Sequence, residues 1–229
     1  MKYTPGPLIA AASGSIGGTV FSRGRYGVYT RNRSIPVSPN TAYQAAAKNY
    51  LSQASQNWRD LAADVRLSWE TWAQSNPVTD NLGQSQTLQG NSAYVMLATR
   101  LLQASEALPT TPPATAAPAA LLTLSATYDV GAGTSVLTFT ATPLGANERL
   151  WMYAAVTNSA ARNYIKNLRK LVTISAAAQA TGYDYEAAVE LRFGALAAGQ
   201  VVTLEAAVMD DTTGLISAFR RTSGTIVST

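Results

Sequence analysis

The side chains best suited to chemistry in this sequence lie near its N-terminus, where arginines alternate with aromatic residues. Guanidinium groups bind carboxylates or phosphates through a fixed fork of hydrogen-bond donors, and aromatic rings add stacking and apolar contact. Residue types of this kind at this spacing are typical of recognition rather than catalysis. The residues that we expect to contact a partner are Phe21, Arg23, Arg25, Tyr26, Tyr29, Arg31 and Arg33.

The charge of the chain is divided unevenly along its length. Residues 1–59 contain seven basic residues and no acidic one, a net charge of +7, whereas residues 60–229 contain ten basic and thirteen acidic residues, a net charge of −3. The basic part has two candidate partners. Its arginines can bind nucleic acid phosphates while its rings stack on bases, or they can dock on the acidic surface of a protein and add a strand to a sheet edge. We favour the protein partner, because a dedicated nucleic-acid binder usually extends its basic surface into a folded domain.

A catalytic set is not visible in the sequence. Histidine, the commonest general base and metal ligand, and cysteine are both absent. A hydroxyl nucleophile would then need a lysine or the N-terminal amine as its base, and the four lysines lie in no recognisable motif. The glycine-rich residues 14–18 lack the Lys-Ser/Thr pair of a phosphate-binding loop. We therefore expect a non-enzymatic protein with no cofactor and no metal.

Asp210 and Asp211, with Glu205, form the one carboxylate group that we consider as a cation site. Adjacent aspartates before Thr-Thr-Gly214 are more often a plain hairpin turn, and a hard cation requires six or more oxygen ligands. We favour the turn.

Composition indicates a protein with a real core and an unusual surface. Of the 229 residues, 47% are hydrophobic and only 13% are charged, against roughly 25% charged in ordinary soluble domains. Such a surface suits a protein packed against neighbours, and an Ala/Thr-rich genome would produce the same composition. No apolar run is long enough to span a bilayer, and no signal peptide is recognised. We expect a soluble protein made in the cytoplasm, with no membrane partner.

Periodicity places an extended basic arm at residues 1–37 and a small helical domain at 38–107. The arm is rich in glycine, and its segments 20–23 and 28–31 are expected to pair as a hairpin. Ser38 before Pro39 predicts a helix start, and apolar spacing predicts helices over 39–61, 63–74 and 91–107, with a loop and a small hairpin between the last two. Three tryptophans at helical spacing, Trp58, Trp69 and Trp72, are expected in the core; their spacing also resembles an HMG box, whose lysine-rich faces are missing here.

A linker and a β-domain are predicted for the rest of the chain. Residues 108–120 contain four prolines, which favour a semi-rigid extended spacer. Beyond it the apolar period changes to two, which predicts an antiparallel β-sandwich of immunoglobulin or fibronectin type over 121–229. The predicted fold class is thus α+β and multidomain. The expected strands are 122–128, 136–142, 150–156, 171–174, 187–193, 201–208 and 215–219, and residues 158–170 form a basic loop or short helix.

Residues 14–103 resemble a family of tailed-bacteriophage virion proteins. The similarity is carried by Gly17-Gly-Thr-Val-Phe-Ser-Arg-Gly-Arg-Tyr-Gly-Val-Tyr-Thr-Arg-Asn-Arg33, by Pro36-Val-Ser-Pro-Asn-Thr41, and by Trp58, Arg66, Trp69 and Trp72 downstream. The family pattern is GG-x-VFSR-x-R-x-G-x-Y-x-R-x-R followed by P-x-NP-x-T. This chain departs from it at Ser38, where the family tends to have Asn.

The resemblance implies a structural protein of the virion. The favoured role is decoration or cementing of the capsid, with many copies or a homo-oligomer docking through the arm on neighbouring subunits such as the major capsid protein. The alternatives are a neck, connector, tail or baseplate component and, from another class, a packaged DNA-binding protein.

Overall fold

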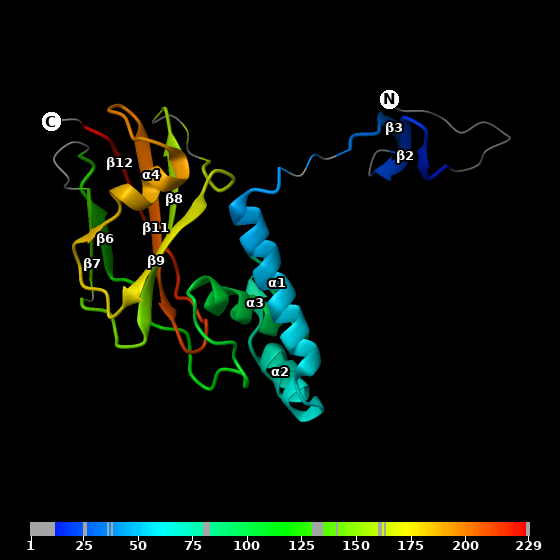
Figure 1. The fold of residues 1–229 in the computed structure, drawn as a ribbon, viewed down its shortest axis with the longest axis horizontal. Helices are drawn as coiled ribbons and strands as arrows, with labels where there is room; N and C mark the ends of the chain where they lie inside the picture. The colour runs from blue at the N-terminus through cyan, green and yellow to red at the C-terminus, as the bar shows by residue number, and fades with distance from the viewer. Residues whose placement is uncertain are drawn as a thin grey trace. The chain divides into compact units, whose positions relative to one another are not determined.

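The structure is a computed structural model that describes residues 12–24, 27–35, 37, 39–79, 83–129, 135–140, 142–159, 162 and 164–227. The chain divides into two compact units, residues 1–45 and 46–229. Helices and antiparallel sheets are both present (Figure 1), so the α+β class is confirmed.

The first unit contains a three-stranded antiparallel meander, formed by β1 (Gly14–Ile16), β2 (Thr19–Gly24) and β3 (Gly27–Asn32). Gly17 makes the first turn with a φ of 55°, a left-handed conformation that favours glycine. β2 pairs with β3 along its whole length, which confirms the predicted hairpin. The backbone of the arm is therefore locally extended, but its strands fold back on one another.

Three helices follow at the predicted places: α1 (Ala42–Asp60), α2 (Ala63–Ser75) and α3 (Gly90–Gln103). A small hairpin of β4 (Val78–Thr79) and β5 (Ser85–Gln86) joins α2 to α3, as the sequence indicated for this loop.

The start of α1 corrects one prediction. Ser38 was expected to cap a helix beginning at Pro39, and Ser38 itself lies outside the described residues. The helix instead begins after Thr41, whose Oγ1 accepts a hydrogen bond from the Gln44 N–H at 3.4 Å, while Gln44 Oε1 accepts one from the Thr41 N–H at 3.2 Å. This reciprocal pair is a capping box, which satisfies two backbone donors that the first turn leaves without partners.

The helices share an aromatic core, as the tryptophan spacing predicted, although only Trp69 is fully buried and Trp58 and Trp72 are half-buried. The ring of Trp69 meets that of Tyr94 edge-on, with the centroids 5.2 Å apart, and Trp58 lies 5.4 Å from the same tyrosine. Such offset and edge-on geometry is the favourable one for aromatic pairs. Trp72 packs on the cluster from its rim, and the fully buried members are Ala54, Trp69, Tyr94, Leu97 and Ala98.

The side chain of Glu70 in α2 caps the N-terminus of α3. Gln89, at the N-cap of α3, makes no side-chain capping bond; instead the Glu70 carboxylate accepts a hydrogen bond from the Gly90 N–H at 2.8 Å. A negative charge at this position also offsets the partial positive charge of a helix N-terminus. Gly90 is needed because a Cβ there would lie 2.7 Å from the Glu70 backbone nitrogen.

Two antiparallel sheets pack face to face in the second unit. One has three strands in the order β10-β7-β6 and the other four in the order β12-β11-β8-β9. Leu137 and Phe139 of the first sheet share one buried cluster with Met152 and Leu204 of the second. The strands are β6 (Thr123–Ala126), β7 (Val136–Thr140), β8 (Glu148–Thr157), β9 (Lys170–Ala177), β10 (Tyr183–Asp184), β11 (Val201–Asp210) and β12 (Arg220–Thr225).

Two of the predicted strands are wrong. Residues 187–193 belong to a helix, α4 (Glu186–Phe193). Their apolar alternation is misleading, because Val189 is fully buried whereas Leu191 is 77% exposed. The Asp184 carboxylate accepts a hydrogen bond from the Glu186 N–H at the helix start. Residues 215–219 form no strand but a single bridge from Ile216 to Met209. The last strand is β12, which the sequence did not predict because its residues, Arg-Arg-Thr-Ser-Gly-Thr, are polar.

Both sides of the sheet pair are closed. On one side Val227 bridges Asp129 next to β6, and the ring of Tyr128 lies over Gly224 of β12, where a Cβ would come within 2.3 Å of it. On the other side the Thr173 hydroxyl of β9 bonds that of Tyr183 in β10 at 3.1 Å, and α4 packs on β9.

The outer face of the four-stranded sheet is covered by α3. Trp151 and Met209 alternate with the residues that face the other sheet, and they form a second buried cluster with Leu101 and Ala104. Helices and sheets in residues 46–229 thus make one compact unit (Figure 1). The predicted boundary at 108–120 stays a prediction about which parts fold on their own.

Gly214 fixes this packing. Its φ is 75°, and a Cβ at this position would lie 2.8 Å from the Leu97 carbonyl oxygen of α3. Arg100, one turn further along α3, donates a hydrogen bond to the Gly214 carbonyl at 3.3 Å. The turn and the helix therefore approach at backbone distance, which only glycine allows.

We predict that Gly214→Ala lowers the free energy of unfolding by about 2–4 kcal/mol, because a left-handed alanine is strained and its Cβ forces the turn away from α3. Gly199→Ala is the matched control: its φ is 86° and nothing lies within 4 Å of a Cβ, so it should cost only the backbone strain, about 1 kcal/mol. Chemical denaturation measures both; equal losses would contradict a close approach at Gly214.

Alkaline pH should weaken the helical core. Burial raises the pKa of Tyr94 to about 12, and its hydroxyl donates a hydrogen bond to Asn57 Oδ1. The folded protein holds this proton more tightly than the unfolded chain. The stabilisation that the protonated Tyr94 hydroxyl contributes is therefore fully present below pH about 10 and is lost as the pH rises towards 12. Denaturant unfolding at increasing pH should show that Tyr94→Phe reduces the alkaline slope of stability by about one proton; an unchanged slope would contradict the role of this hydroxyl.

Candidate partner-binding surfaces

The meander carries the predicted arginines on both of its faces. Directly paired residues share a face, and the register pairs Arg31 with Val20 and Tyr29 with Ser22. Alternation along β3 therefore puts Tyr29, Arg31 and Arg33 on one face, with the Arg33 N–H still bonded to the Gly18 carbonyl at 2.8 Å.

Phe21 and Arg23 alternate with Val20 and Ser22 along β2, so they lie on the opposite face. Of the seven residues that the sequence grouped, the strand pairing separates the five described ones into two sets. Arg25 and Tyr26 lie outside the described residues.

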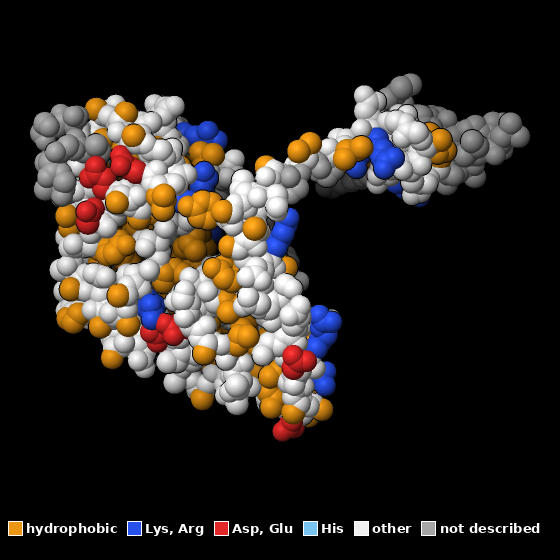
Figure 2. Space-filling model, viewed as in Figure 1, with side chains coloured by type: hydrophobic (Ala, Val, Ile, Leu, Met, Phe, Trp, Pro, Cys, Tyr) orange, Lys and Arg blue, Asp and Glu red, His pale blue; other side chains and the backbone are white. Residues whose placement is uncertain are grey.

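None of the described residues in 12–45 is buried. Phe21 and Tyr29 are half-buried, Arg23, Arg31 and Arg33 are exposed, and Ile16 is 76% exposed. A small sheet needs a hydrophobic face on three or more strands, or packing against a helix, for independent stability. The meander thus combines uncovered apolar residues with unopposed positive charge, and Figure 2 shows blue Lys and Arg side chains on its visible face with no red among them.

The Asp210–Asp211 pair forms a turn, the structure that the sequence favoured over a cation site. Asp210 Oδ1 accepts hydrogen bonds from the Thr212 N–H and hydroxyl at 2.8 and 2.7 Å and from the Thr213 N–H at 3.3 Å. Partial burial pushes the pKa of Asp210 upwards, but these hydrogen bonds outweigh it and lower the pKa below its ordinary value. The carboxylate is therefore ionised and held by the turn itself.

Asp211 takes part in a different contact. The Arg149 guanidinium donates to the Asp211 carboxylate at 3.1 Å and also to that of Glu106, just beyond α3. One arginine of β8 thus joins the end of the helical layer to the turn after β11.

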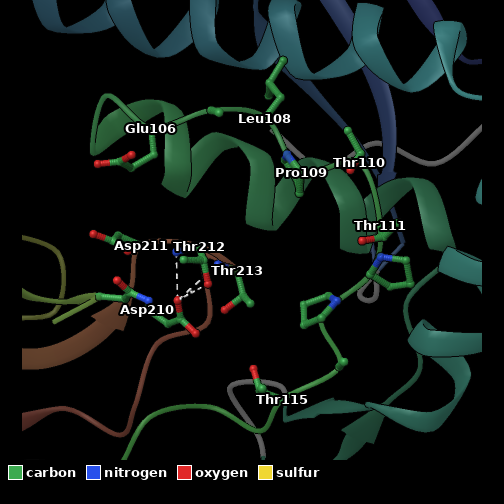
Figure 3. Close-up of a pocket in the computed structure, with 15 residues that line it drawn as sticks. Glu106, Leu108, Pro109, Thr110, Thr111, Thr115, Asp210, Asp211, Thr212 and Thr213 are labelled. Carbon is green, nitrogen blue, oxygen red and sulfur yellow. Dashed lines mark hydrogen bonds between the residues drawn. The ribbon is translucent and has the colours of Figure 1, made fainter. Parts of the chain in front are cut away.

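An acidic pocket opens beside this turn (Figure 3). Its volume is about 700 Å³, and it lies between the proline-rich segment and the turn after β11. The sequence did not predict it, because Glu106 and Asp211 are far apart in the chain and only the packing of α3 brings them together. The lining residues are Glu106–Thr115, Asn147 and Asp210–Thr213.

The basic loop 158–170 is anchored to the sheet by Arg169. Its guanidinium lies 4.9 Å from the centroid of the Tyr153 ring and 5.9 Å from that of Phe219, and it forms an ion pair with Glu205 at 2.6 Å. Ile165 of the same loop is buried. The positive charge of Arg169 is thus used within the fold, whereas Arg162 remains exposed.

Neither a metal site nor a membrane span is found in the described part of the chain. Its His, Cys, Asp and Glu residues form no group of three placed to hold a metal ion. Across the same residues, no helix is both long and apolar enough to cross a bilayer.

Comparison with known proteins finds no match: no family model fits the sequence, and neither the curated proteins nor the solved structures contain a significant relative.

We predict that Asp210→Ala destabilises the fold by about 2 kcal/mol, because it removes a charged acceptor of three hydrogen bonds. Asp210→Asn keeps an acceptor and should cost less. Since the carboxyl pKa is lower in the folded state, the loss should be constant at neutral pH and should shrink as the pH falls through the folded pKa. Urea unfolding as a function of pH measures this; a loss that does not change in acid would contradict the ionised turn.

Proposed function

We propose that this chain is a non-enzymatic structural protein of a tailed-phage virion. In this role it decorates or cements the capsid, and its basic arm docks on neighbouring subunits. Localisation in the virion and assembly in many copies belong to the same proposal. The resemblance over residues 14–103 is its source, and the structure contributes a physical reason for the arm to need a partner.

The proposal rests on the exposure and the positive charge of the meander. The meander exposes Arg23, Arg31 and Arg33, and these residues form no ion pair with any described residue. It also leaves Ile16 uncovered. Binding to an acidic protein surface would neutralise the guanidinium groups and bury the apolar positions together, which is how interfaces gain both specificity and stability.

The two packed sheets support the finer part of the proposal, an accessory β-module of immunoglobulin or fibronectin type. Their antiparallel strands and shared core agree with such a module. Two features differ from a plain sandwich: α4 lies at the edge of β9, and α3 covers the outer face of the four-stranded sheet. Likeness of architecture gives no function by itself.

Two alternatives remain within reach of the same features. A neck, connector, tail or baseplate component would use the arm in the same way on a different neighbour. A packaged DNA-binding protein would place Arg31 and Arg33 on phosphates and Tyr29 on bases. The favoured reading is a protein partner, because residues 60–229, which include most of the second unit, carry a net charge of −3.

The test is reversal of the arm charge. Arg23, Arg25, Arg31 and Arg33 are changed together to Glu, and incorporation of the variant into phage particles is scored beside its thermal melt. We expect incorporation to be lost, because each buried, hydrogen-bonded charge at an interface costs about 2–5 kcal/mol when its partner is left unpaired, before discounting for exposure and non-additivity. The melting temperature should hardly move, because none of the described arm residues is buried.

The charge-matched control changes four exposed basic residues outside the arm to Glu: Lys48, Arg59, Arg66 and Arg162. It should incorporate normally. Normal incorporation of the arm variant would refute docking through the arm, and loss together with a collapsed melt would show that the arm belongs to the fold. Strong, salt-dependent retention of the wild-type chain on DNA, abolished in the arm variant, would favour the DNA-binding alternative.

A further inference from the structure

The acidic pocket beside the Asp210–Thr213 turn has the features of a receptor for a cationic side chain. Its volume of about 700 Å³ falls within the roughly 300–1,000 Å³ of protein ligand pockets. Figure 3 shows Glu106, Asp210 and Asp211 on one side of the pocket and Thr110 and Thr111 on the other.

The charged residues that line the pocket all have the same sign. Glu106, Asp210 and Asp211 all line it, and no lysine or arginine does. Arg149 binds Glu106 and Asp211 from the side of the sheet, so it neutralises one of the three charges and leaves an excess of two. Arg149 contacts one oxygen of each of Glu106 and Asp211, so the second oxygen of each carboxylate is left to accept from an incoming guanidinium.

The opposite wall adds a second kind of complementarity. Pro109, Pro112 and Pro113 line the pocket, and proline-rich segments in extended conformation are surfaces on which aromatic side chains pack. A ligand that combines an aromatic ring with a cation would therefore meet both walls.

The meander presents this combination. Tyr29, Arg31 and Arg33 share one face, so neighbouring side chains are spaced by two residues, about 6.6–6.8 Å. No acidic residue precedes Asp60 in the chain, so nothing in the arm competes with the pocket for these guanidinium groups.

We propose that the acidic pocket of one copy of this chain binds the Tyr29–Arg31–Arg33 face of the meander of a second copy. The inference rests on the proposed function for the role of the arm, and it specifies the neighbour and the receptor. Because the donor face and the receptor pocket are different surfaces, the contact is head-to-tail. Such heterologous contacts build closed rings or open filaments, which fits a protein present in many copies.

The experiment places positive charge in the pocket without removing any bond of the fold. Thr111 and Thr115 are exposed residues of the pocket wall, and both are changed to Lys in the full-length protein. Self-association is measured by sedimentation velocity over a range of protein and salt concentrations. We expect the wild type to form higher oligomers at low salt, and the double variant to associate at least about tenfold more weakly because like charges now meet.

Variants of the donor face and of the receptor pocket, tested alone and mixed, show whether these two surfaces bind each other. Arg31→Glu with Arg33→Glu should also abolish self-association, and mixing this protein with the Thr111→Lys, Thr115→Lys protein should restore association, because the unchanged arm of the lysine variant still meets the unchanged pocket of the glutamate variant. Gln53→Lys with Gln56→Lys, both at exposed positions on α1, is the control for added charge and should associate like the wild type.

The outcomes separate this inference from the proposed function. A wild-type protein that stays monomeric at low salt, or lysines in the pocket that leave association unchanged, would overturn the head-to-tail contact. If the pocket variant also enters particles normally while the arm variant does not, the arm docks on a different virion protein and the proposed function stands. If the arm variant enters particles normally, the proposed function itself fails, whatever the pocket binds.

Discussion

The contact between α3 and the turn at Gly214 determines how the second unit is organised. Leu97 and Arg100 meet the backbone of that turn, and the next residues of α3 cover Trp151 and Met209 on the sheet. Without this contact the outer face of the four-stranded sheet would expose a tryptophan to water. The same contact brings Glu106 next to Asp211, so the acidic pocket depends on it too. A single glycine therefore links the core to the candidate binding surface.

Local signals in the sequence predicted the elements better than their assembly. The helix stripes, the hairpin across Gly24–Gly27 and the Asp210 turn were all visible, because each depends on residues close together in the chain. The covered outer face was missed, although β8 reads Leu150-Trp-Met-Tyr-Ala-Ala-Val with no polar alternation. A run of this kind indicates a strand buried on both sides. The helix at Glu186–Phe193 was mistaken for a strand because seven residues are too few to separate the two periods.

The candidate surfaces differ in the same way. The basic residues of the arm are contiguous in sequence, and composition alone identifies them. Strand pairing then decides which of them act together: Arg31 and Arg33 share a face with Tyr29, and Arg23 lies on the other. The pocket joins residues from the end of α3, the proline-rich segment and the turn after β11. No local pattern relates these three segments, so only the tertiary structure reveals the site.

The closed sides of the sheet pair affect how the protein would behave at high concentration. Edge strands offer unpaired backbone groups to neighbouring chains, which is a route to cross-β aggregation. Here Tyr128 and Val227 seal one side, and on the other Arg192 of α4 donates a hydrogen bond to the Leu171 carbonyl of β9 at 3.0 Å. Crowded copies of this module would then meet through side chains rather than through shared backbone ladders, so each copy would keep its own fold at high protein concentration.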